Sequence, residues 1–169
     1  MARPIPNATR YNLKDNDFIV SKTDLKGKIT YCNQIFIELA KYSEDELIGA
    51  PHNIVRHPDM PRIIYKLLWS RVQSKDEIFA YVKNLSKDGA YYWVYANVTA
   101  SLDTNGTIIG YYSVRRKPNE EAVRIMGDLY AKLLEVESSG GMEASGRYLD
   151  ELLRDKGLSY DEFIAQIQG

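Results

Sequence analysis

Cysteine is almost absent from this chain of 169 residues, which has a single one, Cys32. One cysteine cannot form an internal disulfide or supply a multi-cysteine metal site. Cys32 lies in an expected strand with no second thiol to resolve an oxidised form, so we expect it to be inert. Long apolar runs are missing as well: no segment approaches the roughly 18 apolar residues of a membrane span. Residues 1–10 also lack the apolar core of a signal peptide.

Excess positive charge is the third absence. The formal net charge is -1, which does not provide the basic face expected of a protein that binds nucleic acid. Hydrophobic residues make up 44% of the chain and charged residues 27%, as in ordinary globular proteins. We therefore expect a cytoplasmic protein with one main domain and no nucleic-acid partner.

Aromatic residues, by contrast, are plentiful, and many of the 13 tyrosines cluster between Tyr81 and Tyr112. Turn-forming residues at 24–27, 87–89 and 103–106 separate strand-like runs. The order is two strands, several short helices and then three strands. This predicts an α+β fold with one five-stranded antiparallel sheet and short helices over one face. The strand-like runs are residues 18–23, 28–32, 77–85, 90–102 and 107–117.

The last fifty or so residues read differently, as helices. Pro118 is expected at a first helical turn, and apolar residues then recur at heptad-like spacing from Ala122 to Val136. This stripe is too short for a stable isolated coiled coil, so we expect it to pack on the sheet and contact a partner. The chain is thus expected to comprise an N-terminal arm or cap (1–16), a sheet domain (17–117) and a C-terminal helical extension (118–169). The helices of this extension are expected to end near residues 137, 156 and 167.

The segment 51–61, Pro-His-Asn-Ile-Val-Arg-His-Pro-Asp-Met-Pro, holds both histidines of the chain. It could be a surface loop whose charges are solvated. Two prolines, however, restrict the backbone around His57, and the loop leads into a strongly apolar helix. These features favour a binding loop.

This segment resembles the PAS domain of bacterial aerotaxis receptors. Further stretches resemble the same family in the same order: Thr23-Asp24-Leu25, Tyr42-Ser43 to Gly49, Val82-Lys83-Asn84, Lys87-Asp88-Gly89 and Tyr92-Trp93-Val94. The resemblance covers roughly residues 15–125. It implies a PAS fold, in which a curved antiparallel sheet and short helices enclose a pocket, and it implies non-covalently bound FAD as the cofactor.

By motif position, the resemblance implies that Arg56, His57 and Asp59 are needed for flavin binding, with His52 and Asn84 close to the flavin. An arginine and a histidine can face the pyrophosphate or ribose of FAD. An asparagine offers both a donor and an acceptor to the polar edge of a flavin ring. Asp59 could instead hold Arg56 in place.

Two further residues have alternative interpretations. Asn84 shares a strand face with apolar residues, so it either points into a pocket or sits at a sheet edge bonded to backbone. Trp69 lies on the helix expected to line the pocket, and it either contacts the cofactor or packs in the core. Family members often carry a tryptophan just before the Val-Lys-Asn motif, whereas this chain has Ile78-Phe79 there.

The resemblance implies a redox sensor in energy taxis that signals through contact with a membrane-bound chemotaxis transducer. The chain ends in short helices without a transmembrane segment, so we expect a standalone PAS protein, with a homodimer through the outer sheet face or the C-terminal helices as an option. A haem-binding gas sensor, with His52 or His57 on the iron, and a cofactor-free interaction module stay open. No nucleophile–base arrangement and no Gly-rich dinucleotide fingerprint is present, so we expect no enzyme.

Overall fold

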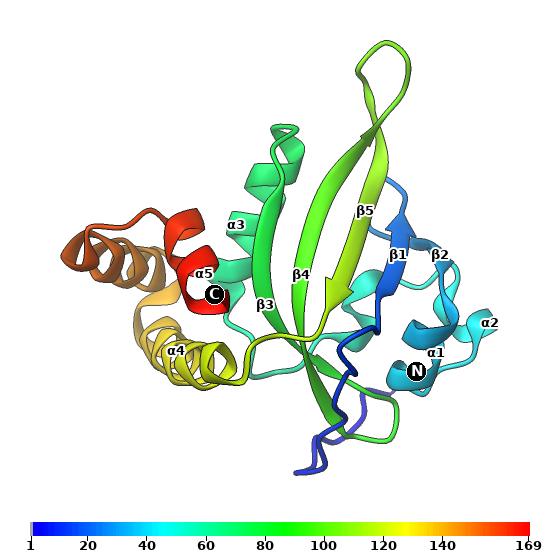
Figure 1. Cartoon of the computed structure of the whole chain (residues 1–169), viewed down its shortest axis with the longest axis horizontal. Helices are drawn as coiled ribbons and strands as arrows, with labels where there is room; N and C mark the ends of the chain where they lie inside the picture. The colour runs from blue at the N-terminus through cyan, green and yellow to red at the C-terminus, as the bar shows by residue number, and fades with distance from the viewer. Residues whose placement is uncertain (1) are drawn as a thin grey trace.

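The computed structural model describes residues 2–169 and is built around one antiparallel sheet in the order β2-β1-β5-β4-β3 (Figure 1). The prediction of a five-stranded antiparallel α+β fold is therefore confirmed. The first two strands form a hairpin and the last three form a meander. Strand β1 pairs with β5 and so joins the two groups. The strands are β1 (Ile19–Thr23), β2 (Ile29–Cys32), β3 (Ile78–Leu85), β4 (Tyr91–Leu102) and β5 (Ile108–Arg116).

Short helices fill the connection between β2 and β3. Asn33 caps the first of them by accepting from the amide of Phe36, and Ser43 with Glu46 forms a capping box at the second. The stretch after residue 50 is less irregular than its prolines suggest, because it contains a turn of 3-10 helix. The elements are α1 (Gln34–Ala40), α2 (Glu44–Leu47), η1 (His52–Val55) and α3 (Arg62–Gln73).

Strand register sorts the side chains onto two faces of the sheet. Asn84 pairs with Tyr92, Ala96 pairs with Arg115, and Arg115 pairs with Ile19. Directly opposed residues share a face, and alternate residues along a strand do too. The face that carries Asn84 and Arg115, called the inner face here, is the one that η1 and α3 cover.

The C-terminal helices cover the β3 side of the opposite, outer face (Figure 1). Helix α4 (Glu120–Lys156) begins after Asn119, which caps it, so Pro118 precedes the helix and does not lie in its first turn. The helix breaks at Gly141, whose φ of 70° favours glycine. Helix α5 (Tyr160–Gln168) follows. The chain's own helices thus bury part of the outer aromatic face.

Tyrosines attach these helices to β3. Tyr130 stacks on Trp93 and donates a hydrogen bond of 2.6 Å to the carbonyl of Tyr81. Tyr160 donates one of 2.9 Å to the carbonyl of Phe79. The cluster of tyrosines read from the sequence therefore serves in part to fix the C-terminal helices on the sheet.

Residues 2–16 lie along the lower end of the sheet without forming a helix or strand of their own (Figure 1). Arg10 makes an isolated bridge to Tyr91 and a two-pronged ion pair with Glu120 at the start of α4. Among residues 2–169, no helix is both long enough and apolar enough to cross a membrane.

Candidate ligand cavity

A cavity of about 260 Å³ lies between the inner face of the sheet and the segment formed by η1 and α3. Alternate residues of four strands line one side of it, and the loop and helix line the other. Its walls are mostly apolar or aromatic, with a few polar groups, which is the usual make-up of a small-molecule site. The residues that carry the argument below are Ser21, His52, Arg56, Trp69, Asn84 and Arg115.

Two buried polar atoms of side chains that line this cavity have no hydrogen-bond partner among residues 2–169: Asn84 Nδ2 and Arg115 Nε. Asn84 and Arg115 are each only 3% exposed. An unsatisfied buried polar group costs about 1–3 kcal/mol, so a folded chain normally pairs it. Unpaired atoms beside one cavity indicate a place for a polar ligand.

Arg115 is the only one of these groups that carries a full charge. Its Nη2 donates to Ser21 Oγ at 2.6 Å, its Nη1 lies 3.3 Å from His52 Nε2, and its guanidinium covers the ring of Phe36. Burial lowers the pKa of Arg115 to about 10, which still leaves it protonated at neutral pH. The neighbours whose charge acts on it are Tyr92 and Cys32, and burial raises the pKa of both. Among residues 2–169, Arg115 is thus a buried cation without an anionic partner.

His52 accepts hydrogen bonds at Nε2, because Arg115 can only donate, so its ring is neutral with the proton on Nδ1. Burial, and then the charge of Arg115, lower the pKa of His52 to about 3. This histidine therefore stays uncharged at physiological pH and holds Ser21 and Arg115 in place.

His52→Gln should weaken the acid sensitivity of folding. Between the ordinary pKa of 6.5 and the folded value of about 3, the unfolded chain binds a proton that the folded chain does not. His52 therefore favours unfolding progressively as the pH falls below 6.5. As the pH falls, the unfolding free energy of both proteins should decrease. The decrease per pH unit should be smaller in the variant, by up to about 1.4 kcal/mol. Urea unfolding between about pH 7 and pH 5 measures this, and equal slopes in both proteins would contradict it.

Arg56 lies at the mouth of the cavity, with its guanidinium 4.1 Å above the ring of Tyr65 in α3. Its backbone pairs with that of Asn84, which fixes the loop to β3. Arg3 from the N-terminal residues donates to the carbonyls of Arg56 and Asn53 at 3.0 and 2.9 Å. The loop is thus held from both sides while the Arg56 side chain remains part of the cavity wall.

His57 and Asp59 are not among the residues that line the cavity. His57 is 3% exposed and packs edge-on against Tyr91, and its Nδ1 accepts from the amide of Asp59. Burial, and then the charge of Lys83, lower the pKa of His57, so the ring is neutral. It supports the turn of the loop.

Asp59 accepts a hydrogen bond of 2.7 Å from Lys83 Nζ on β3. Burial opposes ionisation of this carboxyl, but the Lys83 bond outweighs it and the pKa is lowered. The interpretation in which Asp59 holds Arg56 in place is therefore wrong, because Asp59 pairs with Lys83 and Arg56 packs on Tyr65.

Trp69 extends from α3 into the cavity wall and meets Tyr111 of β5 edge-on, with ring centroids 5.0 Å apart. At the position where the family often has tryptophan, the Ile78 side chain is buried on the inner face. Phe79 faces the other way and stacks on Tyr95. The aromatic wall of the cavity thus comes from Trp69 and Tyr111 together with Tyr65 and Tyr112.

Arg115 and Ser21 are cavity-lining residues that sequence reasoning missed. A usable signal existed for Arg115: in the run 107–117 it alternates with Tyr111 and Ser113. If this face of β5 is placed on the same side of the sheet as Asn84, the charge of Arg115 is buried beside the pocket. The alternation can be read from the sequence, but the register that places the two residues on one side of the sheet cannot.

The described residues 2–169 contain no group of three or more His, Cys, Asp or Glu side chains that could hold a metal ion. A family model described as "PAS fold" matches residues 13–116. The chain is 37% identical over 130 residues to the aerotaxis receptor of Escherichia coli (strain K12). That match covers 76% of this chain and 26% of the receptor, so the chain spans about a quarter of that relative.

Solved structures show the same fold at low identity. The light state of the blue-light photoreceptor Aureochrome1 LOV has a TM-score of 0.57 and 23% identity, covering 68% of this chain and 90% of that one. A light-oxygen-voltage domain studied with a flavin analogue has a TM-score of 0.57 and 21% identity, covering 64% and 82%. From the sheet, the cavity and these matches we conclude that the chain belongs to the PAS family and is a sensor domain related to the aerotaxis receptor.

Proposed function

We propose that the cavity binds FAD and that the chain is a redox or oxygen sensor of energy taxis. The observation that carries this proposal is the cavity itself, with its aromatic walls and the two buried polar atoms, Asn84 Nδ2 and Arg115 Nε, that lack a partner among residues 2–169. A flavin ring presents a flat apolar body with donors and acceptors along one edge. The residues present therefore fit such a ring, and the relation to an aerotaxis receptor supports the choice of cofactor.

The size of the cavity suggests how much of the cofactor it encloses. Its volume of about 260 Å³ is close to the lower end of ligand pockets, which range over roughly 300–1,000 Å³. It suits one ring system better than an entire dinucleotide. Arg56, whose guanidinium lines the cavity and lies over the Tyr65 ring, is the residue we assign to the phosphates, because arginine binds phosphate through paired hydrogen bonds.

When bound, the flavin would supply reversible uptake of electrons and protons, which changes the hydrogen bonds that its edge can make. Asn84 can answer such a change by rotating its amide, since the amide is both donor and acceptor. Arg115 favours added negative charge beside it. His57 and Asp59 act indirectly, by shaping the loop that carries Arg56. No catalysis is required of any of these residues.

The two alternatives are less well supported. For haem, His52 would have to give up its contacts with Ser21 and Arg115 and bring iron next to a buried cation. His57 is directed away from the cavity, against Tyr91. For a cofactor-free module, the unpaired atoms would stay without a partner at a cost to folding.

We further propose a cytoplasmic location and signalling by contact with a membrane-bound chemotaxis transducer, with residues 17–117 as the sensor and 118–169 as the helical output. The relation to the aerotaxis receptor supports this role. A homodimer through the uncovered part of the outer face remains compatible with it.

The proposal is tested by adding FAD to the ligand-free chain and following flavin fluorescence, with haemin added to a parallel sample. We expect saturable quenching with one FAD per chain, because Trp69 and Tyr111 lie at the cavity wall. We expect no shift of the haemin Soret band. A shifted Soret band with no FAD binding would reverse the assignment, and no binding of either would leave an interaction module.

A further inference from the structure

Helix α3 is held at both ends by the C-terminal helices. At its beginning, Glu137 of α4 accepts hydrogen bonds from the backbone amides of Arg62 and Ile63, both at 2.9 Å. At its end, Arg71 donates to both carboxylate oxygens of Asp161 in α5, at 3.0 and 3.1 Å. The middle of α3, between these two anchors, supplies Leu68 and other residues to the cavity wall.

The Glu137 anchor substitutes for a missing cap. Pro61, the N-cap residue of α3, makes no side-chain hydrogen bond to the helix. Helix N-termini favour a carboxylate because of their free amides and the helix dipole. Glu137 supplies it from another helix while only 7% exposed, and Ser145 Oγ donates to its Oε2 at 2.8 Å.

Close packing supports the same contact. Gly146 lies on α4 directly against Ile63, and a Cβ added there would come within 3.3 Å of Ile63 Cδ1. A side chain at this position would require the flexible end of Ile63 to move by a few tenths of an ångström. The second half of α4 therefore packs closely against the start of α3.

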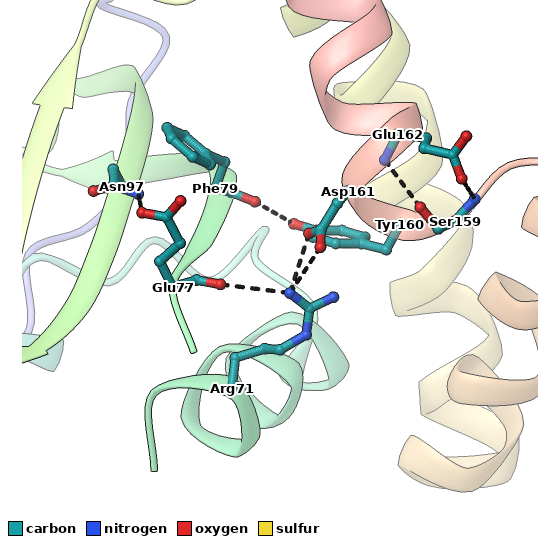
Figure 2. A network of polar contacts seen from close by, with 8 residues as sticks. All are labelled: Arg71, Glu77, Phe79, Asn97, Ser159, Tyr160, Asp161 and Glu162. Carbon is teal, nitrogen blue, oxygen red and sulfur yellow. Dashed lines mark hydrogen bonds and ion pairs between the residues drawn. The ribbon is translucent and has the colours of Figure 1, made fainter. Parts of the chain in front are cut away.

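The anchor at the other end is part of a wider network (Figure 2). Figure 2 shows Arg71 between Asp161 and the backbone of Glu77, with the Tyr160 hydroxyl directed at the carbonyl of Phe79. The Glu77 carboxylate in turn accepts from Asn97 on β4 at 3.2 Å. Helix α5 is thus joined at once to α3 and to the start of β3.

We infer that Glu137 and Asp161 are positioning residues, which set the place of the cavity wall through the two ends of α3 and so couple the cavity to the C-terminal helices. This inference rests on the proposed function only for the choice of FAD as probe. The coupling is reciprocal: a ligand that favours one position of α3 must favour docking of α5 by the same factor.

The test compares the full chain with Glu137→Gln and Asp161→Asn. Glu143→Gln is the matched control, because Glu143 pairs only with Arg147 on the surface of α4. FAD affinity is measured by titration, and docking of α5 by hydrogen exchange of residues 160–168 with and without FAD. We expect FAD to slow exchange in the wild type and control, and both anchor variants to bind FAD about fivefold more weakly and lose the response.

Equal FAD affinity in all four proteins, with α5 exchange indifferent to FAD, would overturn the inference and leave the proposed function standing. Asp161 is 58% exposed at its side chain, so its variant tests the inference even if the buried Glu137→Gln fails to fold.

If FAD does not bind at all, the proposed function fails. A second pair of variants then tests whether the cavity wall is coupled to α5. Leu68→Ala shortens a cavity-lining side chain on α3, and Val98→Ala shortens one on β4. We then expect α5 to exchange about fivefold faster in Leu68→Ala only. Equal exchange in these two variants would overturn the inference.

Discussion

Arg115→Met is expected to stabilise the ligand-free chain while it impairs the response to reduction. The buried guanidinium has no anionic partner among residues 2–169, and removing an ion from water costs several kcal/mol, a penalty that an apolar side chain of similar length avoids. The lost hydrogen bond to Ser21 and contact with His52 offset part of this gain. We expect a net rise in unfolding free energy of about 1–2 kcal/mol.

The same substitution should lower the midpoint potential of bound flavin. Reduction adds electrons to the flavin, and a buried cation beside it favours the form with more negative charge. Loss of the cation should lower the potential by at least about 30 mV, which for two electrons corresponds to about 1.4 kcal/mol. Urea unfolding and a redox titration on one preparation measure the two effects.

Arg116→Met is the control for this experiment. Arg116 is the next residue along β5, but it is exposed on the outer face, over the ring of Tyr95. We expect its removal to change the potential little. Lower stability of Arg115→Met without ligand, or an unchanged potential, would contradict the role that we give to the buried cation.

Asn84→Leu is expected to remove flavin binding while the sheet stays folded. Leucine has a similar volume and leaves no unpaired amide, so the cost to folding should be small. A flavin edge that had bonded to the amide would then be left unpaired. We expect an affinity loss of about 5- to 150-fold, as for about 1–3 kcal/mol, measurable by FAD titration.

Asn97→Leu is the control that distinguishes an effect on the cavity from a general effect on the sheet. Asn97 lies on β4 and faces the other side, where its amide donates to Glu77. This variant should bind FAD as the wild type does. Equal losses in the two variants would indicate a general effect on the sheet and would remove the case for Asn84 as a ligand contact.

The fold was largely readable because local signals agreed with one another. Turn residues at 24–27, 87–89 and 103–106 separated the strand-like runs, and these runs correspond to the five strands of the sheet. The first C-terminal helix was expected to end near residue 137, and the break occurs at Gly141, after which α4 runs on to Lys156. Pro118 was misleading because Asn119 after it is the better cap.

The site was harder, because contacts between distant segments decide it. His52, Arg56, Trp69 and Asn84 were named from motif and alternation, and the structure brings them to one cavity. Arg115 lies 63 residues from its partner His52. The pairing of Asp59 with Lys83 likewise depends on where the loop meets β3. Neither contact has a local pattern.

The central claim, a flavin redox sensor in this cavity, is tested most directly by the absorption spectrum of freshly purified protein before and after dithionite. Wild type, Asn84→Leu and Arg56→Ala are compared at equal concentration. We predict the double peak of a flavin in the wild type, its bleaching by dithionite, and its loss in both variants. A Soret band, or a colourless wild type that also fails to take up added FAD, would contradict the account.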